Sequence, residues 1–116
     1  MTQPVRTLRV YLRDIAESLS RIEQYTKDMT MDQFDEDLKT KDAVIRCLTV
    51  IGEAIKHVPD DFRKEHPEIQ WRKIAGMRDV IVHEYFGVDT DKVWTAVEGD
   101  IPILKSKVQE LLEKTP

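Results

Sequence analysis

The sequence has 116 residues, of which 41% are hydrophobic and 34% are charged, and its formal net charge at pH 7 is −4. This length allows a modest core, so we expect a single domain over residues 1–116. The negative charge argues against non-specific binding to bulk nucleic acid but leaves room for a small basic site. Because Cys47 is the only cysteine, no intramolecular disulfide can form, and a reducing cytoplasm is the expected compartment. No apolar stretch is long enough to span a bilayer, so we expect no membrane partner.

The first expected element is a long amphipathic helix over residues 5–26. Its apolar positions recur in steps of three and four, at Val5, Leu8, Leu12, Ile15, Leu19 and Ile22. The opposite face carries Arg6, Arg9, Arg13, Glu17, Arg21 and Glu23, and we interpret it as a solvated surface.

A short helix is predicted next. Thr30 and Gln33 have the spacing of a capping box, in which each side chain satisfies a backbone N–H of the other residue, and the helix should reach about Leu38. Four acidic residues follow the cap: Asp32, Asp35, Glu36 and Asp37. Because no His or Cys stands at ligand spacing from them, we predict a solvated acidic helix and no metal site.

Residues 43–58 form the best candidate for a core helix, with one apolar stripe made by Val44, Leu48, Ile51, Ile55 and Val58. Gly52 lies within the helix, where glycine costs roughly 1 kcal/mol relative to alanine, so we expect close packing against another backbone there. Glu53 is predicted to be a paired, partly buried carboxylate. Pro59 should end this helix, and Asp60 should cap a short helix that stops at residues 66–67. We interpret His57 and His66 as helix-end histidines without a catalytic role.

The last part of the chain predicts further helix. Asp89 or Thr90 can cap a segment that carries Val93, Trp94 and Val97, and Pro102 predicts a kink or break near residues 99–102. The apolar stripe then continues through Leu104, Val108, Leu111 and Leu112. No strand pattern of useful length occurs, so the expected architecture is an all-α bundle of about five or six helices, three or four of them long.

The most distinctive stretch is residues 71–87, WRKIAGMRDVIVHEYFG. Ile74, Met77, Ile81 and Tyr85 recur at helical spacing, and Gly87 stands where a helix C-terminal glycine is favoured. Arg78, Asp79, His83 and Tyr85 fall within eight consecutive residues of this predicted helix.

Two interpretations of these four residues are open. In the first, they are structural parts of a buried helix. In the second, they cleave RNA without a metal ion, because histidine can serve as general base and acid near neutral pH and arginine can stabilise the negative charge of the transition state. Positions five apart are separated by roughly 140° on a helix, so Arg78 and His83 do not share a face, whereas Asp79 and His83 do.

A symmetric homodimer would resolve this geometry. Ala75 and Gly76 are small enough to let a second helix approach, and two copies of the helix could face one cleft. Two histidines would then be available, one as base and one as acid.

Residues 78–85 resemble the R-x4-H-x-Y motif of the HEPN superfamily, in its HepT-like branch. The resemblance covers nearly the whole chain, through residues 42–46, 51–54, 66–67, 71–78 and 83–87. It implies a HEPN-type helical homodimer, the toxin of a prokaryotic toxin–antitoxin pair, that cleaves RNA without metal or other cofactor. Arg78 and His83 are then the expected catalytic residues, and Asp79 and Glu53 the expected supporting residues.

The resemblance also implies a partner, a minimal nucleotidyltransferase that acts as antitoxin. In this family such an enzyme can transfer AMP from ATP onto the motif tyrosine, which corresponds to Tyr85. An attached phosphate would place negative charge and bulk where RNA must lie. One alternative is a non-catalytic accessory subunit of the nucleotidyltransferase, which the net negative charge favours. A purely structural bundle is the other. Arg72 and Lys73, one turn before the motif, favour the ribonuclease.

Overall fold

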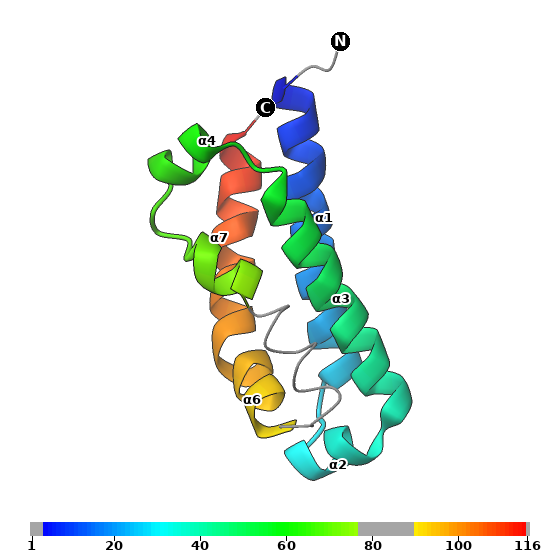
Figure 1. The fold of residues 1–116 in the computed structure, drawn as a ribbon. Helices are drawn as coiled ribbons and strands as arrows, with labels where there is room; N and C mark the ends of the chain where they lie inside the picture. Colours follow the sequence, from blue (N-terminus) through cyan, green and yellow to red (C-terminus); the bar gives the residue numbers. More distant parts are fainter. Residues whose placement is uncertain (1–3, 77–89, 116) are drawn as a thin grey trace.

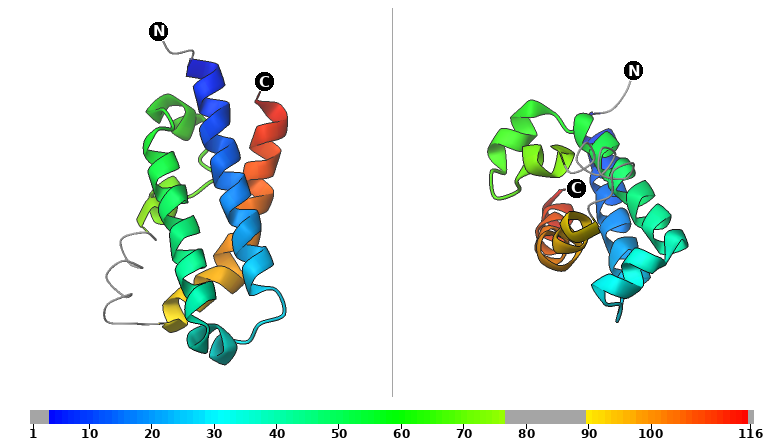
Figure 2. Two further views of the ribbon diagram at one scale, coloured as in Figure 1. Left: turned by 90° about the vertical axis from the view of Figure 1, so that its right-hand side faces the viewer. Right: turned by 60° about the horizontal axis from the view of Figure 1, so that its bottom comes forward.

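Three long helices run along the length of the molecule (Figure 1). The computed structural model describes residues 4–76 and 90–115, with side chains described for residues 8–76 and 91–115. The long helices are α1 (Pro4–Thr26), α3 (Leu38–Lys56) and α7 (Ile101–Lys114). Helix α1 packs against both α3 and α7 and lies between them in the left view of Figure 2.

Shorter helical segments close the ends of this three-helix unit. They are α2 (Met31–Glu36), α4 (Asp60–Glu65), α6 (Thr90–Thr95) and the π-helical turn η1 (Ala96–Asp100). Residues 71–76 are also helical. The described residues contain no strand, which confirms the all-α prediction. None of the helices in this part of the chain is long and apolar enough to cross a membrane.

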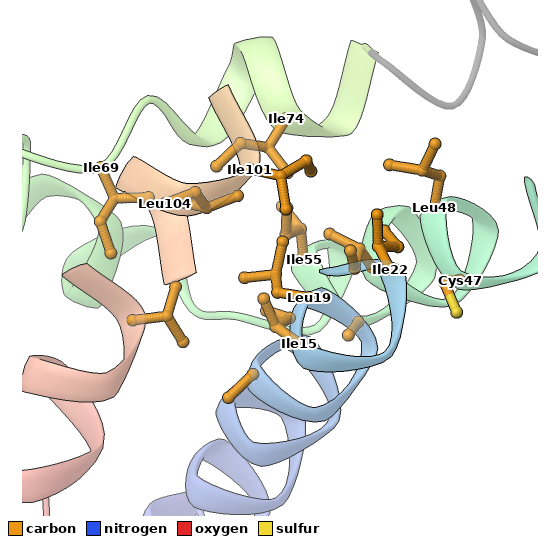
Figure 3. Close-up of a cluster of buried hydrophobic side chains, with 14 of the residues drawn as sticks. Ile15, Leu19, Ile22, Cys47, Leu48, Ile55, Ile69, Ile74, Ile101 and Leu104 are labelled. Carbon is orange, nitrogen blue, oxygen red and sulfur yellow. The ribbon is translucent and has the colours of Figure 1, made fainter. Parts of the chain in front are cut away.

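The apolar stripes predicted on the long helices form the core. On α1, Leu12, Ile15, Leu19 and Ile22 are at most 1% exposed. All five members of the stripe predicted over residues 43–58 are at most 2% exposed, including Val58, which lies just beyond the end of α3. Each such side chain contributes roughly 1.5–3 kcal/mol when it leaves water. Ile69 and Ile74, from the segment after α4, join the same cluster as Ile101 and Leu104 at the start of α7 (Figure 3).

The charged face of α1 is not only a solvated surface. The Nη1 atom of Arg9 donates to the carbonyl of Leu112 at 2.8 Å and also to that of Thr115. Glu23, near the other end of α1, pairs with Lys105 at 2.6 Å. Two of the residues interpreted as solvated therefore attach α1 to α7, while Arg13, Glu17 and Arg21 are exposed as expected.

The capping box before α2 is confirmed. The Gln33 backbone N–H donates to Thr30 Oγ1 at 3.2 Å, and the Thr30 N–H donates to Gln33 Oε1 at 3.0 Å. The prediction for the next boundary is wrong, because α2 ends at Glu36 and α3 already begins at Leu38. Asp37 explains the early start: its carboxylate accepts a hydrogen bond from the Thr40 backbone N–H at 3.0 Å and caps α3.

The expected cap of α4 is also wrong by one residue. Pro59 occupies the N-cap position without a side-chain hydrogen bond, and Asp60 is the first residue of the helix. His57 and His66 stand at the C-caps of α3 and α4, which confirms their interpretation as helix-end histidines. His57 stacks on Tyr11 of α1 with ring centroids 4.7 Å apart.

Pro102 produces a π-helical turn rather than a break. Proline has no N–H to donate to the carbonyl four residues back, and its ring crowds that carbonyl. In η1 the Ile101 N–H bonds instead to the carbonyl of Ala96, five residues back, and α7 follows directly. The chain therefore stays helical through residues 90–114, so the expected disturbance near residues 99–102 is present as a change of helix type.

Candidate functional site

Four of the five predicted site residues, Arg78, Asp79, His83 and Tyr85, lie outside the described residues, and their roles stay predictions. The fifth, Glu53, lies on α3. Its carboxylate pairs with Lys56 at 3.3 Å, as predicted, but Glu53 is exposed rather than partly buried, with 50% of its side chain accessible. Gly52, beside it, is buried. The structure does describe the segment that leads into the motif, residues 66–76.

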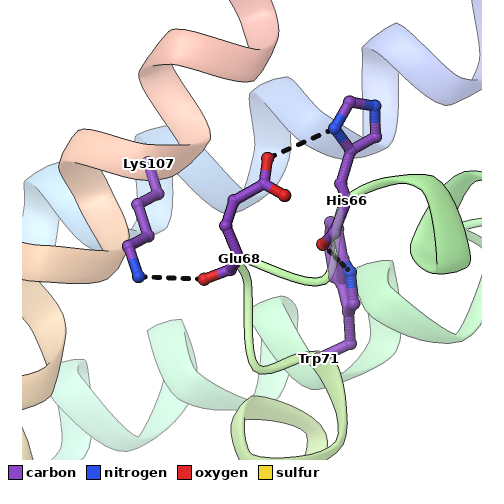
Figure 4. Close-up of polar contacts among 4 residues, drawn as sticks. All are labelled: His66, Glu68, Trp71 and Lys107. Carbon is purple, nitrogen blue, oxygen red and sulfur yellow. Dashed lines mark hydrogen bonds and ion pairs between the residues drawn. The ribbon is translucent and has the colours of Figure 1, made fainter.

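A network of hydrogen bonds fixes the turn between α4 and residue 71 (Figure 4). The Trp71 indole Nε1 donates to the His66 carbonyl at 3.0 Å, and the Trp71 backbone N–H donates to the Ile69 carbonyl at 2.9 Å. From α7, Lys107 Nζ donates to the Glu68 carbonyl at 2.9 Å, a bond that joins residues 39 positions apart. The turn is therefore held by hydrogen bonds within residues 66–71 and by one hydrogen bond from α7.

The Glu68 side chain adds to this network. Its carboxylate lies 3.2 Å from His66 Nδ1. Hydrogen bonding from its own backbone N–H, and then from His66, holds the pKa of Glu68 below its usual value. The deprotonated carboxylate is thus the form that the turn favours, and it can pair with a protonated His66.

Residues 71–76 present one apolar and one polar face. Trp71 and Ile74 are 7% and 6% exposed and join the core, whereas Arg72 and Lys73 between them are exposed. Lys73 reaches Asp100 at the end of η1, at 3.3 Å. The anchoring of one face turns the two basic side chains outward, five and six residues before Arg78, as the prediction of local basic charge requires.

Ala75 and Gly76 are only partly buried, and a Cβ built on Gly76 would meet none of the described atoms within 4 Å. As far as the described residues go, the space beside Gly76 is therefore open. This fits the expectation that small residues leave room for a second helix.

Cys47 is buried on α3, and this burial raises the pKa of its thiol. A buried thiol of this kind is a poor nucleophile. Among the described residues, no three His, Cys, Asp or Glu side chains gather closely enough to hold a metal ion.

Sequence reasoning missed one pair of basic residues. Arg63 and Lys64 of α4 line the same pocket as Arg72 and Lys73. The two pairs are separated by the turn at residues 66–70, and only the fold brings them together. The available signal was weak: a basic last turn on a six-residue helix is common for reasons of helix polarity alone.

Comparison with known proteins gives a consistent result. The family model described as "Ribonuclease HepT-like" matches residues 15–111. A Thermococcus cleftensis protein named "Probable ribonuclease HepT" is 49% identical over 91% of this chain and 96% of its own length. A Caldanaerobacter subterraneus protein with an RNase name is 37% identical over 95% of this chain and 98% of its own length.

A third relative has a different organisation. A Methanocaldococcus jannaschii protein is 43% identical over 94% of this chain, and its name joins a gamma-glutamylcyclotransferase to an RNase. This chain spans only 49% of that relative. No solved structure matches the chain.

Proposed function

This chain belongs to the HepT-like ribonuclease family, and from that premise we propose that it is an endoribonuclease that cuts RNA without a metal ion, using Arg78 and His83. The observation that carries the proposal is the sequence run from Arg78 to Tyr85, which lies inside the matched region. The anchored helix start at residues 71–76 supports it, since a rigid support is what a catalytic helix needs.

The proposed reaction uses the RNA's own 2′-hydroxyl. Its oxygen bonds to the adjacent phosphorus while the bond from phosphorus to the 5′-oxygen breaks, which leaves a 2′,3′-cyclic phosphate and a 5′-hydroxyl. One histidine accepts the 2′-hydroxyl proton, and a protonated histidine donates a proton to the leaving oxygen. Arg78 stabilises the extra negative charge on the phosphorane oxygens. Asp79 holds the His83 imidazole in one tautomer, and Glu53 supports the site from α3.

Base and acid come from two copies of the chain in this proposal. A homodimer that packs through the helix containing residues 75–76 brings two copies of His83 to one cleft. The open space beside Gly76 supports such an approach. A stable monomer with full activity would contradict the dimer, and sedimentation of the active protein measures this directly.

We assign the ribonuclease to a toxin–antitoxin pair in the cytoplasm, with a minimal nucleotidyltransferase as antitoxin. The antitoxin inactivates the ribonuclease by transferring AMP to Tyr85. The Tyr85 oxygen bonds to the α-phosphorus of ATP, and pyrophosphate leaves. The AMP group then places negative charge where an RNA phosphate must lie, and Arg78 binds it in place of substrate.

A second candidate function is that of a non-catalytic accessory subunit of the nucleotidyltransferase. The observation that favours it is the net charge of −4, which is unusual for a protein that binds RNA. The helical fold serves both functions equally.

A cleavage assay separates the two candidates. Purified wild type and His83→Ala are incubated with total cellular RNA in excess EDTA. We expect discrete fragments that end in cyclic phosphate from wild type alone. Intact RNA in both reactions, from dimeric protein with an unmodified Tyr85, would favour the accessory subunit.

The antitoxin step has its own test. Incubation with the nucleotidyltransferase and ATP should add the mass of AMP to wild type and not to Tyr85→Phe. If the variant gains the same mass, Tyr85 is not the acceptor.

A further inference from the structure

A pocket of about 510 Å³ opens between α4 and the start of the helix at residue 71. Four basic side chains line it, Arg63 and Lys64 from α4 and Arg72 and Lys73 from the next helix, together with a single carboxylate, Asp60. We call this the basic pocket. It collects four of the chain's eighteen basic residues around one acidic residue, on a protein whose net charge is −4.

The wall of the basic pocket is rigid. Trp71 is 7% exposed, its indole N–H is bonded to the His66 carbonyl, and the Phe62 ring meets it edge-on with centroids 6.3 Å apart. Phe62 also packs on the His66 ring, with centroids 4.5 Å apart. The basic side chains therefore project from two short segments that are fixed relative to each other.

Internal ion pairs neutralise only part of this charge. Asp60 pairs with Arg63 through Nη2, and Lys73 pairs with Asp100. Among the described residues, no ion pair is found for Lys64 or Arg72. Arg63 Nε is buried without a hydrogen-bond partner, and no other buried side-chain nitrogen or oxygen in the described part of the chain lacks one. The Nε itself is out of reach of a ligand, but about a third of the Arg63 side chain is exposed (33%), so an anion in the pocket can still contact the outer part of this guanidinium.

We propose that the basic pocket binds the phosphates of single-stranded RNA next to the bond that Arg78 and His83 cleave. This inference rests on the proposed function and extends it by a substrate-binding site. Arg72 stands six residues before Arg78, so the two Cα atoms are at most roughly 22 Å apart in any conformation of the chain. The pocket and the motif can therefore contact one short stretch of RNA.

The exposure of the side chains in the basic pocket indicates which part of the RNA they contact. Exposed lysine and arginine side chains at a shallow surface suit a row of phosphates. The Trp71 ring is too buried to stack on a base, so the contacts are to the RNA backbone and carry no sequence preference. An acidic protein segment is the competing ligand.

The test measures binding by fluorescence anisotropy, with a labelled single-stranded RNA that is 2′-O-methylated throughout and cannot be cleaved. The Lys64→Gln/Arg72→Gln variant removes one lysine and one arginine from the pocket. The matched control, Lys39→Gln/Arg46→Gln, removes one of each from exposed positions on α3. Kd is measured across a series of salt concentrations for both variants and wild type.

We expect the pocket variant to bind at least tenfold more weakly at low salt. Its slope of log Kd against log salt concentration should fall by about 1.4, since each phosphate contact on a single strand contributes about 0.7. The control should stay within twofold of wild type. Lys64→Arg/Arg72→Lys should restore the slope, because it keeps both charges. Equal slopes for the pocket and control variants would overturn the proposal.

A polyglutamate peptide serves as the second probe. If the pocket variant loses affinity for polyglutamate and keeps it for RNA, the pocket is an acidic-protein site and the proposal is wrong. Binding is measured without cleavage, so the two proposals fail separately. Loss of RNA binding in the pocket variant together with no cleavage by wild type would remove the ribonuclease proposal but support an RNA-binding pocket.

Discussion

Two pockets on this molecule have similar walls and opposite charge balance. The basic pocket has four basic residues and one acidic residue. The second pocket, which we call the α1-end pocket, lies between the end of α1 and η1 and is lined by Glu23, Asp28 and Glu98 with Lys27 and Lys105. Each pocket has one tryptophan in its wall, Trp71 or Trp94, and each tryptophan is 7% exposed.

The difference lies in how the charges are used. In the α1-end pocket, Lys105 is paired with Glu23 at 2.6 Å, so its charge ties α7 to α1. In the basic pocket Asp60 pairs with Arg63 and Lys73 pairs with Asp100, whereas among the described residues no ion pair is found for Lys64 or Arg72. The net charge of −4, which is a sum over the whole chain, does not give the local charge of either pocket. The negative charge argued against non-specific binding to bulk nucleic acid but left room for a small basic site, and the basic pocket is a local site of that sign.

The largest expected effect is on stability, and it concerns the buried tryptophan that each pocket has in its wall. Trp71→Ala and Trp94→Ala should each lower the free energy of unfolding by about 3–5 kcal/mol, because each removes a large buried side chain. Urea denaturation measures both. Trp71→Phe should cost only about 1 kcal/mol, mainly through the lost bond to the His66 carbonyl. A loss below 1 kcal/mol for Trp71→Ala would show that the wall of the basic pocket is not rigid.

The next effect separates the two pockets. Arg72→Glu should raise the KM for RNA cleavage by roughly tenfold with kcat little changed, because a contact to a phosphate that does not react binds substrate and transition state alike. Lys27→Glu reverses one charge in the α1-end pocket and should change KM less than twofold. Steady-state kinetics on one defined RNA measures both variants. Equal increases in KM would mean that overall charge, not the basic pocket, governs binding.

A smaller effect tests the use of charge in the α1-end pocket. Lys105→Ala should lower stability by about 0.5 kcal/mol, since the pair is partly exposed, and should leave RNA affinity unchanged. Thermal unfolding and anisotropy measure the two quantities on one sample. Weaker RNA binding would place Lys105 on the RNA path and contradict the division between the pockets.

The smallest effect is a pH dependence that belongs to neither pocket. The hydrogen bond from the Thr40 N–H holds the pKa of Asp37 below its usual value. Its stabilising effect is therefore complete above about pH 4 and is lost as the pH falls through the lowered value. Asp37→Asn keeps a cap acceptor without the charge, so its urea midpoint should change less than that of wild type between pH 5 and pH 3. Parallel curves would remove this role for the Asp37 charge.

The sequence predicted the long helices because their apolar positions repeat over several turns. The stripes on α1 and α3 are buried as expected, and the capping box at Thr30 forms. The prediction from sequence was wrong at the start of α3, because the first turns of that helix are polar or exposed. Leu38, for example, is 70% exposed. Periodicity reports only the buried face, whereas the cap that sets the start is a single local hydrogen bond from Thr40 to Asp37.

The candidate site likewise has one part that the sequence predicted and one part that it did not. Residues 78–85 stand together in the sequence, so their pattern was visible without a structure. The basic pocket is not visible in the sequence, because Arg63 and Arg72 are nine residues apart on different helices. Their approach depends on the turn at residues 66–70, which the Lys107 bond from a distant helix helps to hold. Contacts of that range follow from the fold and not from local spacing.

The most direct test of the account is to map where RNA lies on the protein. A single-stranded, 2′-O-methylated RNA with photoreactive uridines is crosslinked to the full chain, and the modified peptides are identified by mass spectrometry. If RNA binds in the basic pocket beside the motif, we expect crosslinks in residues 60–73 and in the motif region, 78–85, with none in the α1-end pocket. Crosslinks concentrated at residues 20–29 and 94–105, with residues 60–73 unmodified, would contradict it.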